Sequence, residues 1–351
     1  MWGTSNDDTH SWRNLSGLQL LVWPVAIVFL VQVLLAGGFE PLRGGFSLGR
    51  ILGVGAIKLE ALWSTGALGS KGIVQNGEWW RILCPIFLHV SVVHVFMNLW
   101  CLVSLGRLAQ QLYTRSGLIF VFIVTGVSGV LFSFAWALYE GGGPLTVGAS
   151  GAVCGFLGLL LSHLRTRSDA AAQWYARQLR NWAFFLAVWS FLPGISLSGH
   201  LGGFVAGYAL GKVLPTGHFA HLRSQGRRRM MPLVTGGLAL LSLAALIVGG
   251  VGAKERMTEI QSAEKFRSSL QFAYDRVNNK KLKLGGVETA IRANSVPHEL
   301  ETAKAEALQL LLDSPPNTIS RGRLRQIRSD VGLWCVKKAP DLYRFTGSTG
   351  K

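Results

Sequence analysis

The stretch LTVGASGAVCGFLG, residues 145–158, decides how the rest of the chain is interpreted. Ser150 lies between Gly148 and Gly151, where loop residues give way to an apolar helix. The N–H groups in the first turn of a helix have no acceptor within the helix, so they can stabilise an oxyanion that develops beside the serine hydroxyl. The same pattern also suits a helix cap followed by small residues that pack against another membrane helix. This stretch alone leaves both interpretations open.

The composition is that of a polytopic membrane protein. The chain has 351 residues, of which 49% are hydrophobic and 15% are charged, and its mean hydropathy is +0.34. Several apolar runs approach the roughly 20 residues that cross a bilayer. The net charge of +17 suits nucleic acid, but it is also common where loops face a cytoplasm, and no nucleic-acid partner is expected. The four cysteines predict no disulfide framework, because three of them lie in or beside apolar segments.

Seven apolar segments are predicted to span the membrane in an all-α fold. They cover residues 18–36, 90–113, 118–139, 150–163, 182–192, 198–214 and 233–251. The first six form a core, residues 18–214, after a polar segment, residues 1–17, that lacks the features of a cleaved signal peptide. The connection over residues 37–85 is expected to lie partly in the membrane interface, where its sequence EWWR, residues 78–81, suits the headgroup region.

The segments before and after the seventh span are more polar than the spans themselves. A basic loop, residues 215–232, precedes it. The polar tail, residues 254–351, is predicted to be helical with a break at Pro315-Pro316. The tail is expected to form either a small domain or a partly disordered arm, and the sequence leaves both open.

Polar side chains in the second predicted span are candidates for a functional site. His94 and Asn98 are four residues apart and so share one helix face, and His89 lies just before them. Polar groups inside a membrane segment are costly unless they find partners. On spacing alone, a structural pair that bonds a neighbouring helix is as good an interpretation as a functional one.

Glycines of similar spacing follow two further candidates. Glycines four residues apart follow Ser150 in one predicted span, and Gly203 and Gly207 follow His200 in another. Small residues at this spacing let helix backbones approach closely. Two such helices packed together would bring the Ser150 hydroxyl and the His200 imidazole to a similar depth.

Residues that the sequence lacks restrict the chemistry further. No His-Glu-x-x-His sequence occurs, and no Asp or Glu lies within a predicted span. These absences disfavour a zinc-dependent or aspartyl intramembrane protease and a carboxylate proton relay. A Ser-His-Asp triad cannot form inside the bilayer, so only a Ser–His dyad remains, with a nucleophile and a base but no carboxylate to orient the imidazole. No metal and no cofactor are expected.

The distribution of Lys and Arg predicts the orientation in the membrane. Basic residues follow the second, fourth and sixth predicted spans, including a cluster at residues 223–229. Loops rich in Lys and Arg face the cytoplasm. We therefore expect a cytoplasmic N-terminus, with the Ser150 and His200 ends of their spans near the outer face and the tail outside.

Four motifs together resemble those of the rhomboid family of intramembrane serine proteases. They are Trp80-Arg81, His89-x4-His94-x3-Asn98, Gly148-Ala-Ser150-Gly151 and His200-x2-Gly203-x3-Gly207. Each motif is weak alone, but the four occur in the family's order and on the corresponding spans between residues 78 and 211. The resemblance does not extend to the tail. Many relatives carry a Glu where this chain has Gln110, which is far from the site.

This resemblance implies a rhomboid-like six-helix bundle with an added seventh helix, and it implies a mechanism. Ser150 would be the nucleophile, and His200 would be the general base that then gives its proton to the leaving amine. His94 and Asn98 would form the oxyanion hole with the Ser150 N–H. Structural roles near the site would fall to Trp80, Arg81, His89, Gly148, Gly151, Gly203 and Gly207.

The resemblance also implies a substrate class and a location. The substrate would be a transmembrane segment of a single-span or polytopic membrane protein, cut near the outer face through an acyl-enzyme. The alternative is a non-proteolytic relative that binds membrane clients, but such proteins usually lack the serine or the histidine. The compact layout favours a bacterial plasma membrane.

Overall fold

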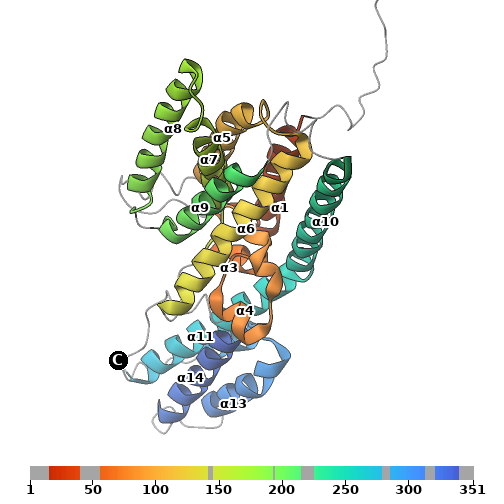
Figure 1. Ribbon diagram of the computed structural model, residues 1–351. Coiled ribbons are helices and arrows are strands. Elements are labelled where there is room, and N and C mark those ends of the chain that lie inside the picture. The colour runs from red at the N-terminus through yellow and green to blue at the C-terminus, as the bar shows by residue number, and fades with distance from the viewer. Residues whose placement is uncertain are drawn as a thin grey trace, which may run out of the picture.

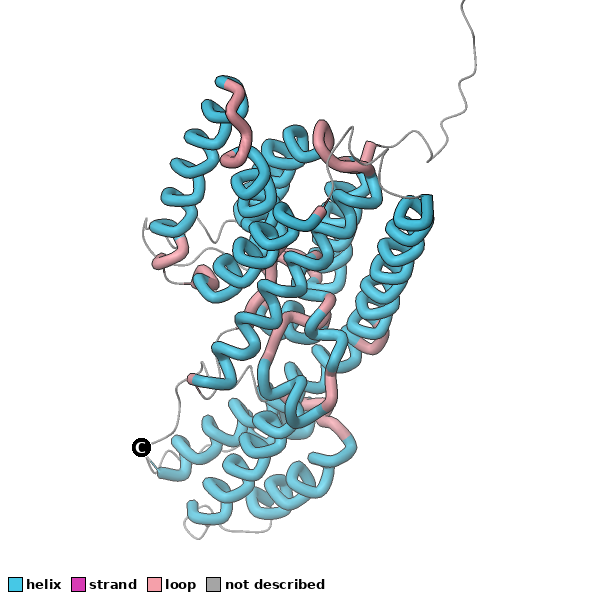
Figure 2. The backbone as a smooth tube through the Cα atoms, viewed as in Figure 1, coloured by secondary structure: helices cyan, strands magenta, loops and turns pink. Residues whose placement is uncertain are grey.

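The described part of the chain is almost entirely helical (Figures 1 and 2). A computed structural model describes residues 16–39, 56–140, 145–192, 194–214, 225–278, 285–312 and 321–339. Most of the predicted polar segment 1–17, the first part of the basic loop 215–232 and the predicted break at Pro315-Pro316 lie outside these ranges. The predicted all-α polytopic fold class is confirmed.

Seven helices account for the predicted spans. They are α1 (Gln19–Ala36), α5 (Val92–Ala109), α6 (Arg115–Tyr139), α7 (Ser150–Leu164), α8 (Ala170–Trp189), α9 (Leu197–Val213) and α10 (Gln225–Gly250). By length and composition α1, α5 and α6 can cross a membrane, and so can a segment, Pro232–Arg276, that begins within α10. The helix α7 is apolar but shorter.

The helix that contains most of the predicted fifth span, residues 182–192, begins earlier in the chain than that span. The helix α8 begins well before residue 182, because the side chain of Asp169 caps it and accepts a hydrogen bond of 2.8 Å from the Ala172 N–H. This bond, with help from the nearby Arg167, holds the pKa of the Asp169 carboxyl below its usual value. The first turns of α8 are polar, so hydropathy alone detects only the apolar end of the helix.

The centre of the bundle is a backbone contact between α7 and α9. Twelve of the fifteen residues of α7 are buried. A Cβ atom added to Gly207 would overlap the carbonyl oxygen of Gly155, and one added to Gly203 would overlap that of Gly151. No residue other than glycine fits at these positions without moving the helices apart. The two glycine faces seen in the sequence therefore pack directly on each other.

A compact loop region covers the end of the bundle at which α7 begins. Residues 56–90, called loop 1 here, contain α3 (Leu59–Ser64), α4 (Ser70–Asn76) and the 3-10 turns η2 (Trp79–Ile82) and η3 (Cys84–Ile86). Leu68 of loop 1 and Thr146, just before α7, exchange backbone hydrogen bonds of 2.9 and 3.1 Å. Loop 1 is thereby attached to the segment that leads into Ser150.

The tail folds as a small helical domain at the same end of the bundle (Figure 1). It contains α11 (Ala253–Asn278), α12 (Gly285–Ala293), α13 (Glu301–Leu312) and α14 (Arg321–Lys338). These helices enclose a separate core that includes Phe266, Leu270, Ile291, Leu311, Leu324, Ile327, Val331 and Cys335. The helix α11 also packs on loop 1, where Ile260 contacts Trp63. Of the two alternatives that the sequence leaves open, the described residues form the folded domain.

We predict that Gly207→Ala lowers the free energy of unfolding by at least about 2 kcal/mol, because the overpacked helices must separate. Thermal unfolding of the purified protein in detergent measures this change. The matched control is Gly236→Ala in α10, where an added Cβ has nothing within 4 Å. Equal unfolding temperatures for the two variants would show that the contact between α7 and α9 can accommodate an added methyl group.

Candidate functional site

Ser150 is held at the first position of α7 by its preceding loop. The Gly148 N–H donates to the carbonyl oxygen of Pro85 at 2.8 Å, and the Ala149 N–H donates to Nε2 of His89 at 3.4 Å. The N–H of Ser150 itself belongs to the first turn of the helix, where no intrahelical acceptor exists. It can therefore donate to a ligand beside the serine hydroxyl.

Gly148 is required at this turn for two reasons. Its φ of +125° is a conformation that other residues rarely adopt. A Cβ added there would also lie 2.8 Å from Cε1 and 2.9 Å from Nε2 of His94. The same added atom would lie 3.7 Å from Oγ of Ser150. The His94 ring therefore lies against the turn that carries the serine.

The helix α5 brings the other predicted polar residues to this turn. Ser91 caps α5, and its hydroxyl accepts a hydrogen bond of 3.1 Å from the His94 N–H. One turn later, Nδ2 of Asn98 donates to the carbonyl oxygen of His94 at 2.9 Å. The rings of His89 and His94 are 5.0 Å apart between centroids. His89 and His94 thus lie at the turn that carries Ser150, and Asn98 is bonded to the backbone of His94 one turn further along α5.

His89 is completely buried, and its polar groups fasten three parts of the chain together. Its backbone N–H donates to Oε1 of Gln32 in α1 at 3.0 Å, and its Nδ1 lies 3.2 Å from the carbonyl oxygen of Phe87. With Nδ1 protonated, Nε2 accepts from the Ala149 N–H. His89 therefore joins α1 and loop 1 to the loop before α7.

His200 lies in the first turn of α9, and several side-chain hydrogen bonds fix this turn. Ser196 caps the helix and accepts a hydrogen bond of 3.1 Å from the Gly199 N–H. The Ser196 hydroxyl also lies 2.9 Å from that of Ser133 in α6. On the imidazole, Nδ1 lies 2.6 Å from Oγ of Ser190, the residue that ends α8.

The glycine contact brings Ser150 and His200 to the same end of the bundle. Gly151, next to the serine, faces Gly199, next to the histidine, and a Cβ added to Gly151 would lie 3.5 Å from the Gly199 carbonyl oxygen. Within the described ranges, no hydrogen bond joins the two side chains directly. Such bonds between catalytic groups are often long before a substrate binds.

Sequence reasoning missed Ser190 and Gln32. Both are ordinary polar residues within or at the end of apolar segments, and no spacing rule relates them to His200 or His89. Among the described residues, no group of three His, Cys, Asp or Glu side chains is arranged to hold a metal ion.

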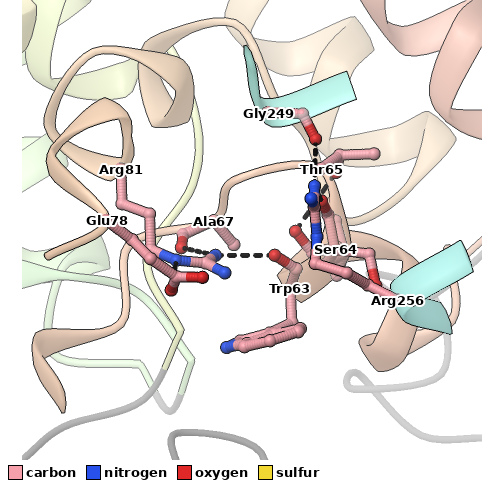
Figure 3. Close-up of polar contacts among 9 residues, drawn as sticks. Trp63, Ser64, Thr65, Ala67, Glu78, Arg81, Gly249 and Arg256 are labelled. Carbon is pink, nitrogen blue, oxygen red and sulfur yellow. Dashed lines mark hydrogen bonds and ion pairs between the residues drawn. The ribbon is translucent and has the colours of Figure 1, made fainter. Parts of the chain in front are cut away.

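Arg81 is completely buried inside loop 1 (Figure 3). Its Nε donates to Oε2 of Glu78 at 2.6 Å, and its Nη1 donates to the carbonyl oxygens of Trp63 at 2.6 Å and Ala67 at 2.9 Å. The expectation that residues 78–81 face the lipid headgroups is therefore wrong for Arg81. Half of the surface of Trp79 is exposed, so that residue can still meet the interface.

Arg256 connects the tail to loop 1 beside this cluster (Figure 3). Its Nη2 donates to the carbonyl oxygens of Ser64 at 2.7 Å and Gly249 at 2.6 Å, and its Nη1 donates to that of Val251 at 3.0 Å. One side chain of α11 thus bonds the end of α3 and the end of α10. The position of loop 1, and with it the loop before Ser150, is linked to the tail.

We predict that Arg256→Gln lowers the free energy of unfolding by about 1–3 kcal/mol, because three backbone carbonyls lose a charged donor. Thermal unfolding in detergent provides the measurement. Arg292→Gln is the control, since Arg292 makes only an exposed ion pair with Glu288, and such pairs contribute little. A loss no larger than that of the control would mean that Arg256 does not hold loop 1 and the tail together.

The chain is similar to known proteins of one family. Residues 76–216 match the Rhomboid domain. Rhomboid-like protease 2 of Toxoplasma gondii is 32% identical over 217 residues, which cover 58% of this chain and 71% of that protein. RHOMBOID-like protein 6, mitochondrial, of Arabidopsis thaliana is 33% identical over 186 residues, covering 50% of this chain and 54% of that protein.

Rhomboid protease GluP of Bacillus subtilis (strain 168) is 31% identical over 159 residues, covering 44% of this chain and 29% of that protein. The chain thus spans about half or less of the length of the plant and Bacillus relatives. It spans more than two thirds of the Toxoplasma relative. The Rhomboid match, residues 76–216, contains the helices that hold Ser150 and His200. This chain is an integral membrane protein that belongs to the rhomboid family.

Proposed function

We propose that this protein is an intramembrane serine endopeptidase that uses a dyad of Ser150 and His200. The observation that carries the proposal is the glycine contact, which places the two residues at the starts of two helices in backbone contact. The names of the rhomboid proteases that the chain resembles support the same activity.

Each step of peptide hydrolysis has a group to perform it. Oγ of Ser150 bonds to the scissile carbonyl carbon while its proton moves to Nε2 of His200. The C–N bond then breaks, and His200 gives that proton to the departing amine nitrogen, which leaves an acyl-enzyme. A water molecule, deprotonated in its turn by His200, releases the acid and restores the serine.

The oxyanion that forms in these steps would be stabilised by donors beside Ser150. The Ser150 N–H and the His94 ring lie at the same turn. Asn98 uses one N–H of its amide on the His94 carbonyl and has a second N–H to offer. Hydrogen-bond donors that are fixed in advance gain strength in a site that excludes bulk water.

The substrate would be a transmembrane segment of another membrane protein, cut near the outer face. Ser150 lies at the bundle end covered by loop 1 and the tail domain, opposite the end of α7 that leads into the basic residues Arg165 and Arg167. From the basic loops we infer a cytoplasmic N-terminus. The compact layout favours a bacterial plasma membrane. A substrate segment whose helix is easily opened would be cut faster, because helical carbonyls are already hydrogen-bonded.

We predict that wild-type protein in liposomes cleaves a single-span model substrate and that Ser150→Ala and His200→Ala each reduce the rate at least about 1,000-fold. Appearance of the cleaved fragment on a gel measures the rate. Ser104→Ala is the control, because the Ser104 hydroxyl bonds only the Trp100 carbonyl of its own helix. Equal cleavage by all variants would reject the dyad. Binding of the substrate without cleavage by any form would favour the client-binding alternative.

We also predict that His94→Ala and Asn98→Ala each lower kcat by about 100- to 1,000-fold with little change in KM, as expected for donors that act in the transition state. Initial rates over a range of substrate concentrations in liposomes separate the two constants. His163→Ala, at the opposite end of α7, should leave both constants unchanged. A rise in KM at constant kcat would instead assign His94 and Asn98 to substrate binding.

A further inference from the structure

We propose that Ser190 is a positioning residue that orients His200, in the place that a carboxylate takes in a catalytic triad. This inference rests on the proposed function, in which His200 is the general base. The dyad by itself lacks a group that fixes the tautomer and the direction of the imidazole. Ser190 ends α8, and only 3% of its surface is exposed.

The hydrogen bonds of Ser190 determine which nitrogen of His200 carries the proton. Oγ of Ser190 lies 2.6 Å from the Leu186 carbonyl oxygen and 2.6 Å from Nδ1 of His200. A carbonyl oxygen has no proton to donate, so the single hydroxyl proton must point to Leu186. The Ser190 oxygen then accepts from a protonated Nδ1. This tautomer leaves the lone pair on Nε2 free to take the proton of Ser150.

The hydrogen bond between Nδ1 of His200 and Oγ of Ser190 also stabilises His200 after Nε2 has taken the proton of Ser150. When Nε2 is protonated the ring carries a positive charge, and the hydrogen bond from Nδ1 to Oγ becomes stronger. A hydroxyl performs this task less strongly than a carboxylate would, but it needs no ionised group in the interior of the bundle. The proton on Nδ1 stays in place throughout, so the transfer between Ser150, His200 and the amine remains balanced.

Neighbouring hydroxyl groups are already committed to other partners. The hydroxyls of Ser133, Ser196 and Ser198 bond to one another, and Ser196 also caps α9. Within the described ranges, Ser190 supplies the side chain that bonds the imidazole of His200. Because Ser190 directly follows the last residue of α8 and His200 belongs to α9, the orientation of the base depends on where the end of α8 lies.

The test measures kcat and KM for cleavage of the single-span substrate in liposomes, with active sites counted by a fluorophosphonate label. Ser190→Ala is expected to lower kcat by about 10- to 100-fold, the range for losing one hydrogen bond to a charged group, with KM changed less than twofold. Ser190→Thr keeps the oxygen and is expected to retain most of the wild-type kcat.

The control is Ser242→Ala in α10. Ser242 is equally buried, and its hydroxyl makes only the bond to the Leu238 carbonyl of its own helix. This variant should cleave at the wild-type rate. If Ser190→Ala does not fold, Ser190→Cys replaces it, because a thiol is similar in size but a weak acceptor. The cysteine variant should then show the loss of kcat.

Two outcomes overturn the positioning role while leaving the dyad intact. One is a wild-type kcat in Ser190→Ala, or in its cysteine substitute, when His200→Ala is inactive. The other is an equal loss of kcat in Ser190→Thr and Ser190→Ala when both unfold at the wild-type temperature. Failure of the proposed function gives a different result, in which wild type does not cleave or His200→Ala cleaves as wild type does.

Discussion

The contact between the backbones of α7 and α9 is the constraint on which the rest of the structure depends. Carbonyl oxygens of Gly151 and Gly155 occupy the space that side chains at positions 203 and 207 would need. In a bilayer, lipid tails are as apolar as leucine, so close packing rather than water exclusion drives helices together. The contact therefore stabilises the bundle and also fixes the relative height of Ser150 and His200. In the proposed function, stability and catalysis depend on this one set of glycines.

The glycine contact sets the positions of α7 and α9, and hydrogen bonds between neutral groups then fix the residues at the starts of these two helices. His89 holds the loop before α7 through the Ala149 N–H, and Gly148 allows that loop to turn against His94. Hydroxyls rather than carboxylates surround the start of α9 and its histidine. Neutral partners suit a membrane interior, where an ionised side chain without a close partner is costly. The chemistry of the site therefore depends on geometry more than on buried charge.

Charged side chains are used instead where loop 1 meets the tail. Arg81 is buried against Glu78 and backbone carbonyls, and Arg256 bonds the ends of α3 and α10. The helices of loop 1 are short, so carbonyl groups at and just after their ends need donors from elsewhere. Two arginines supply them. The tail domain is in this way part of the support for the loop that precedes Ser150, although its own core is separate.

The sequence by itself determined the helical membrane fold, the order of the helices and the candidates His94, Asn98, Ser150 and His200, because hydropathy, glycine spacing and intramembrane polar residues are local signals. It could not find the start of α8, the burial of Arg81 or the folded state of the tail. These depend on contacts between segments far apart in the chain, such as Arg256 with Ser64. The partnership of Ser190 with His200 was likewise decided only by tertiary structure, because a hydroxyl becomes a partner only when packing brings an imidazole nitrogen to within 2.6 Å of it.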